Sequence, residues 1–240
     1  MVLYQLHRTY VRFFLPQSRM VAGFIGDHAP STSIENCVEI GCGARLFETR
    51  IKSTWKPSHY IATDFDSNSR AGVVADATML PFHSASVDLV IALQVLQHVP
   101  DSKLVLAEVA RVLLPGSQLI ASYPFMYSEC DVMDFRRWTQ QGMEQDLHAA
   151  GLQVIAHEKL GGPLFMIVML MTALIAAFVP GGRSRWRGGT TRLGMLRIAT
   201  VTALSFPFHL IGWIALTIDR LLPGAPTYVG GIVLAQKINP

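Results

Sequence analysis

Residues 38–43 read Val38-Glu39-Ile40-Gly41-Cys42-Gly43, a short apolar run that carries a carboxylate and ends in two glycines. The run predicts a buried first strand that leads into a tight turn, because glycine tolerates the left-handed backbone conformations that such turns need. A helix-like segment follows, so the backbone N–H groups of the turn and the start of the helix would face a bound ligand. The stretch therefore predicts a nucleotide-like cofactor at the first turn between a strand and a helix.

Two features of this turn distinguish between cofactor classes. A dinucleotide-binding turn has the pattern G-x-G-x-x-G, and its third glycine packs the helix against the strand. Here the third glycine is missing, because Leu46 stands in its place, and Glu39 would put negative charge near a pyrophosphate. A carboxylate suits a cationic ligand better, and S-adenosylmethionine carries a sulfonium and an ammonium group but no phosphate. The turn thus favours S-adenosylmethionine over a dinucleotide.

The segments that follow these glycines resemble the class I S-adenosylmethionine-dependent methyltransferases, especially the branch that includes the quinone-biosynthesis enzymes. Residues 76–82 are similar to the acid-x-x-x-Leu-Pro-Phe signature of that family, and residues 96–101 resemble its loop after the fourth strand. The resemblance covers roughly residues 36–160 and resumes near residue 227. The chain predicts strands at 59–64, 86–92, 117–123, 152–157 and 228–237, a third sheet element at 73–82, and a helix from about 102 to 114 that stops at Pro115-Gly116.

The resemblance implies an α/β fold with a doubly wound, seven-stranded, mostly parallel sheet of the Rossmann-like methyltransferase type. An apolar helical hairpin is inserted before the last strand. We therefore expect residues 1–162 and 223–240 to form the methyltransferase domain. Residues 163–222 are expected to form an arginine-rich helical insertion that associates with a membrane.

The resemblance also implies which residues hold S-adenosylmethionine, the expected cofactor. Asp64 lies about twenty residues after the glycines, where the family's carboxylate holds the ribose hydroxyls, and Asp76 matches the acid that contacts the adenine amino group. Arg45 replaces the third glycine of the frequent G-x-G-x-G pattern, and Gln94 and Gln97 replace smaller or acidic residues, which predicts an unusual loop on the substrate side. The alternative is a Rossmann-like domain that has lost its ligand. The expected cofactor-binding residues are Glu39, Gly41, Cys42, Gly43, Asp64, Phe65, Asp76, Ala77 and Gln94.

Four further side chains are candidates for acceptor binding or catalysis. His98 lies at the expected C-terminal edge of the sheet, where it would act as a general base for an oxygen nucleophile or pack within its loop. Tyr123 ends the fifth strand and would line the acceptor pocket or cap the core. Asp134 and Arg137 belong to an acid-aromatic-x-Arg-aromatic-Thr motif of some of these methyltransferases. They would orient the substrate, or form a salt bridge that ties a loop to a helix capped by Thr139.

Cysteine usage and the N-terminus narrow the class of protein further. The three cysteines, Cys37, Cys42 and Cys130, form no C-x-x-C pair, so we expect neither a disulfide framework nor a metal site. Cys42 fits the turn as a small filling residue. Basic side chains between residues 7 and 12 lie among apolar ones without a continuous apolar core, which favours an amphipathic helix over a signal peptide.

The apolar and positively charged residues are concentrated in one part of the chain. Hydrophobic residues make up 50% of the sequence, and residues 164–179 and 198–218 form two long apolar runs. Residues 163–222 contain six arginines against Asp219 alone, a net charge of +5, whereas the rest of the chain carries −2. The arginines alternate with apolar runs and not with stacking aromatics, so we expect no nucleic-acid partner. An anionic membrane surface fits this pattern better.

The hairpin could lie in the membrane surface or cross the bilayer. The first apolar run would be about 24 Å long as a helix, against a hydrocarbon core of about 30 Å. A double crossing would also place five arginines on the far side, against the positive-inside tendency. We predict a hairpin in the cytoplasmic leaflet, which puts the protein at the cytoplasmic face of a membrane. The alternatives are two transmembrane helices, or helices packed on their own domain or on a partner subunit.

The function predicted from these features is methyl transfer from S-adenosylmethionine to a small or lipid-linked acceptor at the membrane surface. A quinone precursor, a polyprenyl-linked sugar or a phospholipid head group would fit. The alternative is a membrane-docked binding or scaffold protein with a degenerate methyltransferase fold, against which the joint presence of the acids and glycines argues. The acceptor atom and the oligomeric state stay open.

Overall fold

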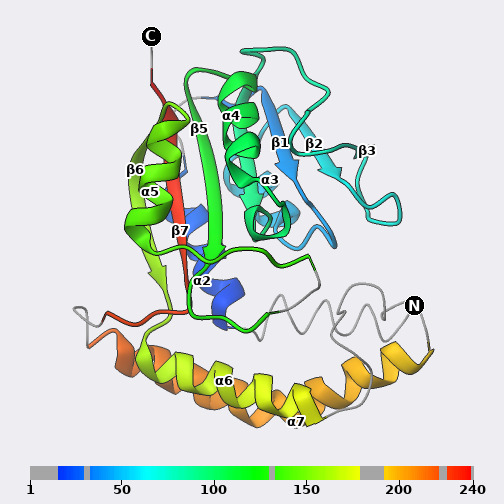
Figure 1. The fold of residues 1–240 in the computed structure, drawn as a ribbon, viewed down its shortest axis with the longest axis vertical. Helices are drawn as coiled ribbons and strands as arrows, with labels where there is room; N and C mark the ends of the chain where they lie inside the picture. Colours follow the sequence, from blue (N-terminus) through cyan, green and yellow to red (C-terminus); the bar gives the residue numbers. More distant parts are fainter. Residues whose placement is uncertain (1–15, 30–32, 130–132, 179–191, 222–225, 239–240) are drawn as a thin grey trace. The chain divides into compact units, whose positions relative to one another are not determined.

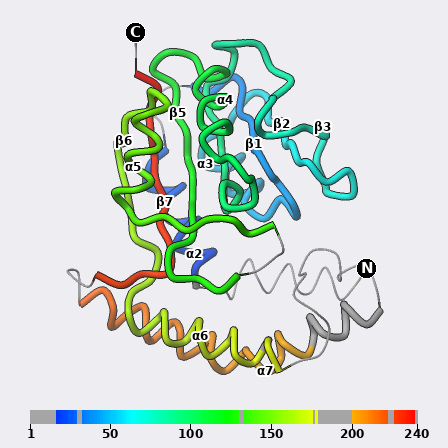
Figure 2. The backbone as a smooth tube through the Cα atoms, in the orientation of Figure 1, coloured from blue at the N-terminus to red at the C-terminus, as the bar shows by residue number. Residues whose placement is uncertain are grey.

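The computed structural model describes residues 16–29, 33–129, 133–178, 192–221 and 226–238 (Figure 1; Figure 2). The chain divides into two compact units, each described here by itself. The sheet unit comprises residues 22–124, 135–158 and 231–240, and the helical unit comprises residues 1–21, 125–134 and 159–230. The domain division expected at residues 162 and 222 stays a prediction. The amphipathic helix expected around residues 7–12 lies outside the described residues.

A seven-stranded sheet forms the centre of the fold, with the strand order β3-β2-β1-β4-β5-β7-β6. The pairs β1–β2, β2–β3, β1–β4 and β4–β5 are parallel, and β7 runs opposite to its neighbours (Figure 1). The predicted fold class is therefore confirmed. The strands are β1 (Asn36–Ile40), β2 (His59–Asp64), β3 (Val73–Val74), β4 (Val87–Leu93), β5 (Leu113–Pro124), β6 (Leu152–Leu160) and β7 (Gly230–Lys237).

The strand order reverses between β1 and β4, so the chain leaves the ends of these two strands in opposite directions. In open α/β sheets, ligands bind outside the carboxyl ends of the strands at such a reversal. The glycine turn after β1 and the loop after β4 both start at this point of the sheet. The fold thus brings the glycine turn and the loop that carries Gln94 and His98 to one edge.

The described helices are α2 (Pro16–Asp27), α3 (Glu48–Thr54), the 3₁₀ turn η1 (Leu96–His98), α4 (Ser102–Val112), α5 (Gln140–Ala149), α6 (Pro163–Phe178) and α7 (Arg192–Asp219). Helix α2 precedes β1, and the other described helices lie between successive strands. Thr139 is the N-cap of α5, since its side chain accepts a hydrogen bond from the Gly142 N–H at 3.1 Å. Helix α4 ends at Val112, two residues earlier than predicted, and Leu113 already pairs with Val87. The backbone before Pro115 disfavours the helical conformation, which explains the early end.

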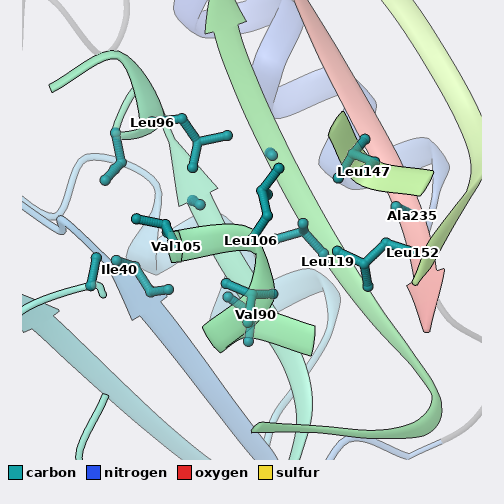
Figure 3. Close-up of a cluster of buried hydrophobic side chains, with 14 of the residues drawn as sticks. Ile40, Val90, Leu96, Val105, Leu106, Leu119, Leu147, Leu152 and Ala235 are labelled. Carbon is teal, nitrogen blue, oxygen red and sulfur yellow. The ribbon is translucent and has the colours of Figure 1, made fainter. Parts of the chain in front are cut away.

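The core of the sheet unit lies between the strands and the helices α4 and α5 (Figure 3). Strand residues such as Val90 and Leu119 are fully buried, as expected for a parallel sheet covered by helices. Leu106 of α4 and Leu147 of α5 complete the cluster. This packing covers β4 and β5, whose ends reach the candidate site.

Helices α6 and α7 form the predicted hairpin before the last strand, within the helical unit (Figure 1). The Asp219 carboxylate at the end of α7 accepts hydrogen bonds from the backbone N–H groups of Leu164 at 3.1 Å and Phe165 at 2.9 Å. It thereby caps the first turn of α6 and closes the hairpin. Within the described residues, one helical stretch, Thr200–Asp219, has the length and composition to cross a membrane, and Pro163–Ile175 is apolar but shorter. Pro207 lies inside α7 without ending it.

Candidate cofactor and acceptor site

The glycine turn after β1 has the left-handed backbone that its sequence predicts. Gly41 has a φ of 61° and Gly43 a φ of 46°. A Cβ atom on Gly41 would lie 2.6 Å from the Val95 side chain, so the position has no room for a side chain. Arg45, at the third glycine position of the family pattern, is also left-handed with a φ of 54°. The arginine therefore keeps the conformation for which glycine is common, at a cost of about 1–2 kcal/mol.

Asp64 connects the end of β2 to the glycine turn. One of its carboxylate oxygens accepts a hydrogen bond from the Gly43 N–H at 2.7 Å, and the other accepts from the Asp66 N–H at 2.9 Å. These two backbone donors fix the orientation of the carboxylate. An acid held at this place is suited to receive the hydroxyls of a ribose. Phe65, the next residue, is 72% exposed and offers an apolar surface beside it.

Glu39 is almost fully buried beneath the turn. It accepts a short hydrogen bond from the Tyr60 hydroxyl, and the Arg45 guanidinium lies over the Tyr60 ring at 5.7 Å. Burial raises the pKa of Glu39 to about 7, although the Tyr60 hydrogen bond and the Arg45 charge oppose this shift. Burial, followed by the charge of Glu39, raises the pKa of Tyr60, so its hydroxyl stays a donor. The pair places a carboxyl group that can ionise near neutral pH at the base of the candidate cofactor site.

The raised pKa of Glu39 predicts that cofactor binding is linked to proton release. The cationic groups of S-adenosylmethionine favour ionised Glu39. The affinity of the protein for S-adenosylmethionine should therefore increase as the pH rises from about 6 to about 8. Without ligand, the contribution of Glu39 to the free energy of unfolding has the opposite pH dependence. Unfolded glutamate titrates near 4.5, so the contribution of Glu39 to folding is present below that pH and is lost as the pH rises through about 7.

Calorimetric titration near pH 7 in phosphate and in Tris measures this proton release, because the two buffers differ in ionisation enthalpy. The apparent enthalpies of binding should differ between the buffers for the parent protein and agree for Glu39→Gln. Equal apparent enthalpies for the parent protein would contradict the prediction.

Asp76 is exposed after β3 and is oriented by its own loop. One carboxylate oxygen accepts hydrogen bonds from the Thr78 N–H at 2.8 Å and the Thr78 hydroxyl at 2.7 Å. Ala77 is buried, and Met79 is 76% exposed. The Asp76 carboxylate is suited to the polar edge of a nucleobase, and the exposed Met79 side chain is suited to its face.

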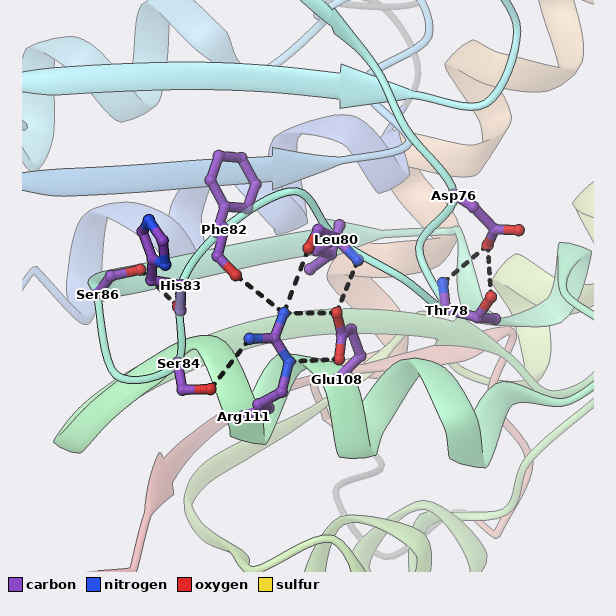
Figure 4. A network of polar contacts seen from close by, with 9 residues as sticks. All are labelled: Asp76, Thr78, Leu80, Phe82, His83, Ser84, Ser86, Glu108 and Arg111. Carbon is purple, nitrogen blue, oxygen red and sulfur yellow. Dashed lines mark hydrogen bonds and ion pairs between the residues drawn. The ribbon is translucent and has the colours of Figure 1, made fainter.

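A cluster on α4 fixes the loop that follows Asp76 (Figure 4). The Arg111 guanidinium makes two hydrogen bonds of 2.7 Å to the Glu108 carboxylate and also donates to the carbonyl oxygens of Leu80 and Phe82. Glu108 in turn accepts from the Leu80 N–H at 2.7 Å. The Arg111 hydrogen bond lowers the pKa of Glu108, so the carboxylate stays charged. This ion pair was not predicted from the sequence, although the i, i+3 spacing of its residues on a helix indicates one.

The loop after β4 carries the predicted acceptor-side residues. Gln94 has a left-handed φ of 56° and donates from its backbone to the Ser122 hydroxyl at 3.0 Å. The Gln97 amide nitrogen donates to the Gln94 carbonyl oxygen at 3.0 Å and lies 3.3 Å from the Nε2 atom of His98. Which of the two nitrogens donates depends on the tautomer of the His98 ring. The Gln97 side-chain oxygen is buried without a hydrogen-bond partner among the described residues.

Tyr123 is fully buried at the end of β5. Its hydroxyl lies 2.5 Å from Nε2 of His157, whose Nδ1 lies 3.1 Å from the Glu144 carboxylate. Its ring also meets Trp138 edge-on. The structure therefore places Tyr123 in the core, which was the structural alternative for this residue.

The 134–139 motif is attached to η1. The Phe135 N–H donates to the Gln97 carbonyl oxygen at 2.8 Å, and the Arg136 guanidinium donates to the Pro100 carbonyl oxygen at 3.0 Å. Arg137 is half-buried and donates to the Arg136 carbonyl oxygen, while Asp134 belongs to the helical unit. Gln94, Gln97, His98 and Arg137 thus lie on connected loops, and their roles in the reaction stay predictions.

The cysteines and acids offer no competing chemistry among the described residues. No group of three or more His, Cys, Asp or Glu side chains could hold a metal ion there. Cys42 is buried in the glycine turn, and burial raises the pKa of its thiol to about 12, which disfavours the thiolate that a nucleophile needs.

Comparisons with known proteins agree with this geometry. Residues 38–121 match the family described as "Methyltransferase domain". The chain is 31% identical over 121 residues to O-methyltransferase rstn1 of Aspergillus nomiae, covering 44% of this chain and 54% of that protein. It is also 31% identical over 114 residues to malonyl-[acyl-carrier protein] O-methyltransferase of Hahella chejuensis, covering 41% of each. The chain thus spans about half the length or less of these curated relatives.

Solved structures share the fold at low sequence identity. A Haemonchus contortus phosphoethanolamine N-methyltransferase 2 has a TM-score of 0.58 at 14% identity, covering 96% of this chain and 56% of its own. The [4+2]-cyclase SpnF has a TM-score of 0.54 at 16% identity, covering 93% of this chain and 82% of its own. The second of these is described as a cyclase, so these two matches establish the fold and leave the reaction to be argued from the site.

Proposed function

We propose that this chain transfers the methyl group of S-adenosylmethionine to a small-molecule acceptor. The chain belongs to the class I S-adenosylmethionine-dependent methyltransferases. One observation carries this proposal: the Asp64 carboxylate is held by the Gly43 N–H of a left-handed glycine turn. This arrangement lies where the strand order of the sheet reverses. It joins an acid for the ribose to a turn whose backbone would face the rest of the ligand.

The residues of the chain would divide the work of binding and alignment. S-adenosylmethionine supplies an activated methyl group for an in-line displacement. Asp64 and Asp76 would hold the ribose and the adenine, and the backbone of the glycine turn would contact the amino-acid part above Glu39. The protein then needs to align the donor carbon with the acceptor and exclude water. His98 is our candidate to take the proton of an oxygen nucleophile, and both curated relatives are named O-methyltransferases.

A more specific proposal concerns the acceptor, which we infer to be lipid-carried and reached at the membrane surface. The apolar runs and the net charge of +5 in residues 163–222 support it. Lipid extraction from a strain that lacks the protein, followed by mass spectrometry, would test it. A lipid lighter by one methylene is expected, and unchanged lipids together with a lighter soluble metabolite would contradict a lipid-carried acceptor.

Asp64→Ala should weaken binding of S-adenosylhomocysteine by about 1–3 kcal/mol, because the ribose loses its hydrogen bonds. Asp66→Ala is the matched control, since Asp66 is an exposed acid of the same loop whose side chain, among the described residues, bonds to Asn68 alone. Isothermal titration calorimetry of both variants measures the difference. Equal affinity in Asp64→Ala and the parent protein would refute the site, and no binding by the parent would favour a scaffold protein with a degenerate fold.

A further inference from the structure

The outer side of the α6–α7 hairpin is exposed and predominantly apolar, although Thr217 of α7 is exposed as well. On α6, Ile167, Leu170, Leu174 and Phe178 are 48–80% exposed. They recur every three or four residues and therefore share one face of the helix. The sequence contains no charged residue in 163–178 or in 200–218.

Helix α7 presents the same kind of face. Leu204, Leu210, Ile211, Ile214 and Ile218 are 43–61% exposed and also recur at helical spacing. A surface helix of a water-soluble protein normally turns charged and polar residues to solvent at such positions. We call these exposed residues of the two helices the apolar face. A surface of this composition indicates a partner that is itself apolar.

The opposite side of the hairpin is packed against protein. Phe165 and Val168 of α6 and Leu216 of α7 are buried in one cluster, to which Met20 of α2 and Val229 also belong. At Gly212 the helices approach closely, because a Cβ atom there would lie 3.3 Å from the Phe165 ring. The hairpin therefore has one side that is occupied and one that is available.

A cation lies beside the C-terminal half of α7 on the occupied side. The Arg19 guanidinium of α2 lies 5.0 Å from the centre of the Trp213 ring. If α7 crossed a bilayer, Trp213 would lie within the stretch Thr200–Asp219 and would carry this arginine with it into the hydrocarbon region. Burying an arginine there costs at least about 2.5–3.5 kcal/mol. This contact argues for a hairpin that lies along a surface.

We infer that the apolar face inserts into one leaflet of an anionic bilayer, with the hairpin axis parallel to the membrane plane. The inference deepens the proposed membrane setting, and it does not depend on the chain being an active methyltransferase. Electrostatics favours lipid over a second copy of the chain as the partner of the apolar face. A second copy would bring another net charge of +5 in residues 163–222, whereas anionic head groups would neutralise the first.

Charge substitutions on the apolar face test the surface. Ile214→Glu and Leu174→Glu in the full chain should each weaken co-sedimentation with phosphatidylcholine–phosphatidylglycerol vesicles by about tenfold or more, because a carboxylate must enter the leaflet. Leu104→Glu is the matched control: Leu104 is a leucine of α4 that is 55% exposed. It should bind vesicles within about twofold of the parent protein.

Depth measurements distinguish an in-plane hairpin from a spanning one. Ile167→Trp and Phe178→Trp place probes about 16 Å apart along α6. Quenching by lipids brominated at different depths, relative to the parent protein, should give the same shallow depth for both. Depths that differ by most of this separation would overturn the in-plane geometry.

Two further outcomes would overturn the inference. One is vesicle binding by Ile214→Glu equal to that of the parent. The other is a parent protein that does not bind vesicles but sediments as a dimer, and a dimer that dissociates in Ile214→Glu. This result would assign the apolar face to a second copy of the chain. Titration with S-adenosylhomocysteine in the same samples keeps this result separate from the proposed function, whose site lies in the sheet unit.

Discussion

Gly41→Val should abolish measurable binding of S-adenosylhomocysteine, with an affinity at least about 100-fold below that of the parent protein. Gly41 has a φ of 61°, and its missing Cβ would lie 2.6 Å from one Val95 methyl group and 3.1 Å from the other. A β-branched residue there adds backbone strain of about 1–3 kcal/mol. It also forces the turn or Val95 to move, and the turn is the part of the chain that would face the ligand. Isothermal titration calorimetry measures the loss.

Gly151→Val separates the steric effect from backbone strain. Gly151 is also left-handed, with a φ of 78°, but a Cβ atom there would meet nothing within 4 Å. This control should melt earlier than the parent protein while keeping its affinity for S-adenosylhomocysteine. If Gly41→Val binds within about twofold of the parent, the glycine turn does not contact the ligand and the assigned site is wrong.

The local motifs of the sequence were sufficient to predict the glycine turn and the acid at the end of β2. Gly41, Gly43 and Asp64 lie within short stretches whose residue types and order already determine a strand, a turn and a strand-end acid. The left-handed glycines confirm the predicted turn. The hydrogen bond from the Gly43 N–H to Asp64, which was not predicted, joins this turn to the end of β2. A parallel sheet makes such predictions possible, because strand ends meet at one edge regardless of what lies between them.

The contacts between distant segments could not be read from the sequence. Glu39 forms a hydrogen bond with Tyr60 because β1 and β2 pair side by side, and the sequence near Glu39 does not indicate a hydroxyl partner. Asp219 was noticed only as the one acid of an arginine-rich segment, yet it caps a helix that begins 56 residues earlier, at Pro163. In both cases the partner is chosen by the fold and not by the local pattern. The role of Tyr123 was open for the same reason.

Gly231→Ala should lower the free energy of unfolding of the sheet unit by about 3 kcal/mol, at the upper end of what overpacking costs. A Cβ atom on Gly231 would lie 2.4 Å from both the Cζ and the hydroxyl oxygen of Tyr123. Tyr123 has nowhere to move, because it is fully buried and its hydroxyl is bonded to His157. Chemical denaturation followed by circular dichroism measures the loss. Gly23→Ala in α2 is the matched control: nothing lies within 4 Å of its Cβ, so alanine should leave stability unchanged or slightly raise it.

The substitution Tyr123→Phe distinguishes a role of Tyr123 in the core from a role in the acceptor pocket. A core role predicts that Tyr123→Phe loses stability, because Nε2 of His157 loses the Tyr123 hydroxyl, while methyl transfer per folded molecule stays within about twofold of the parent. A role in the acceptor pocket predicts the reverse, with a normal unfolding midpoint and a turnover reduced at least about tenfold. Since the ring is packed against Trp138 and against the backbone of Gly231, we expect the first result. A folded Tyr123→Phe protein that binds S-adenosylhomocysteine normally but transfers no methyl group would assign the hydroxyl to the reaction instead.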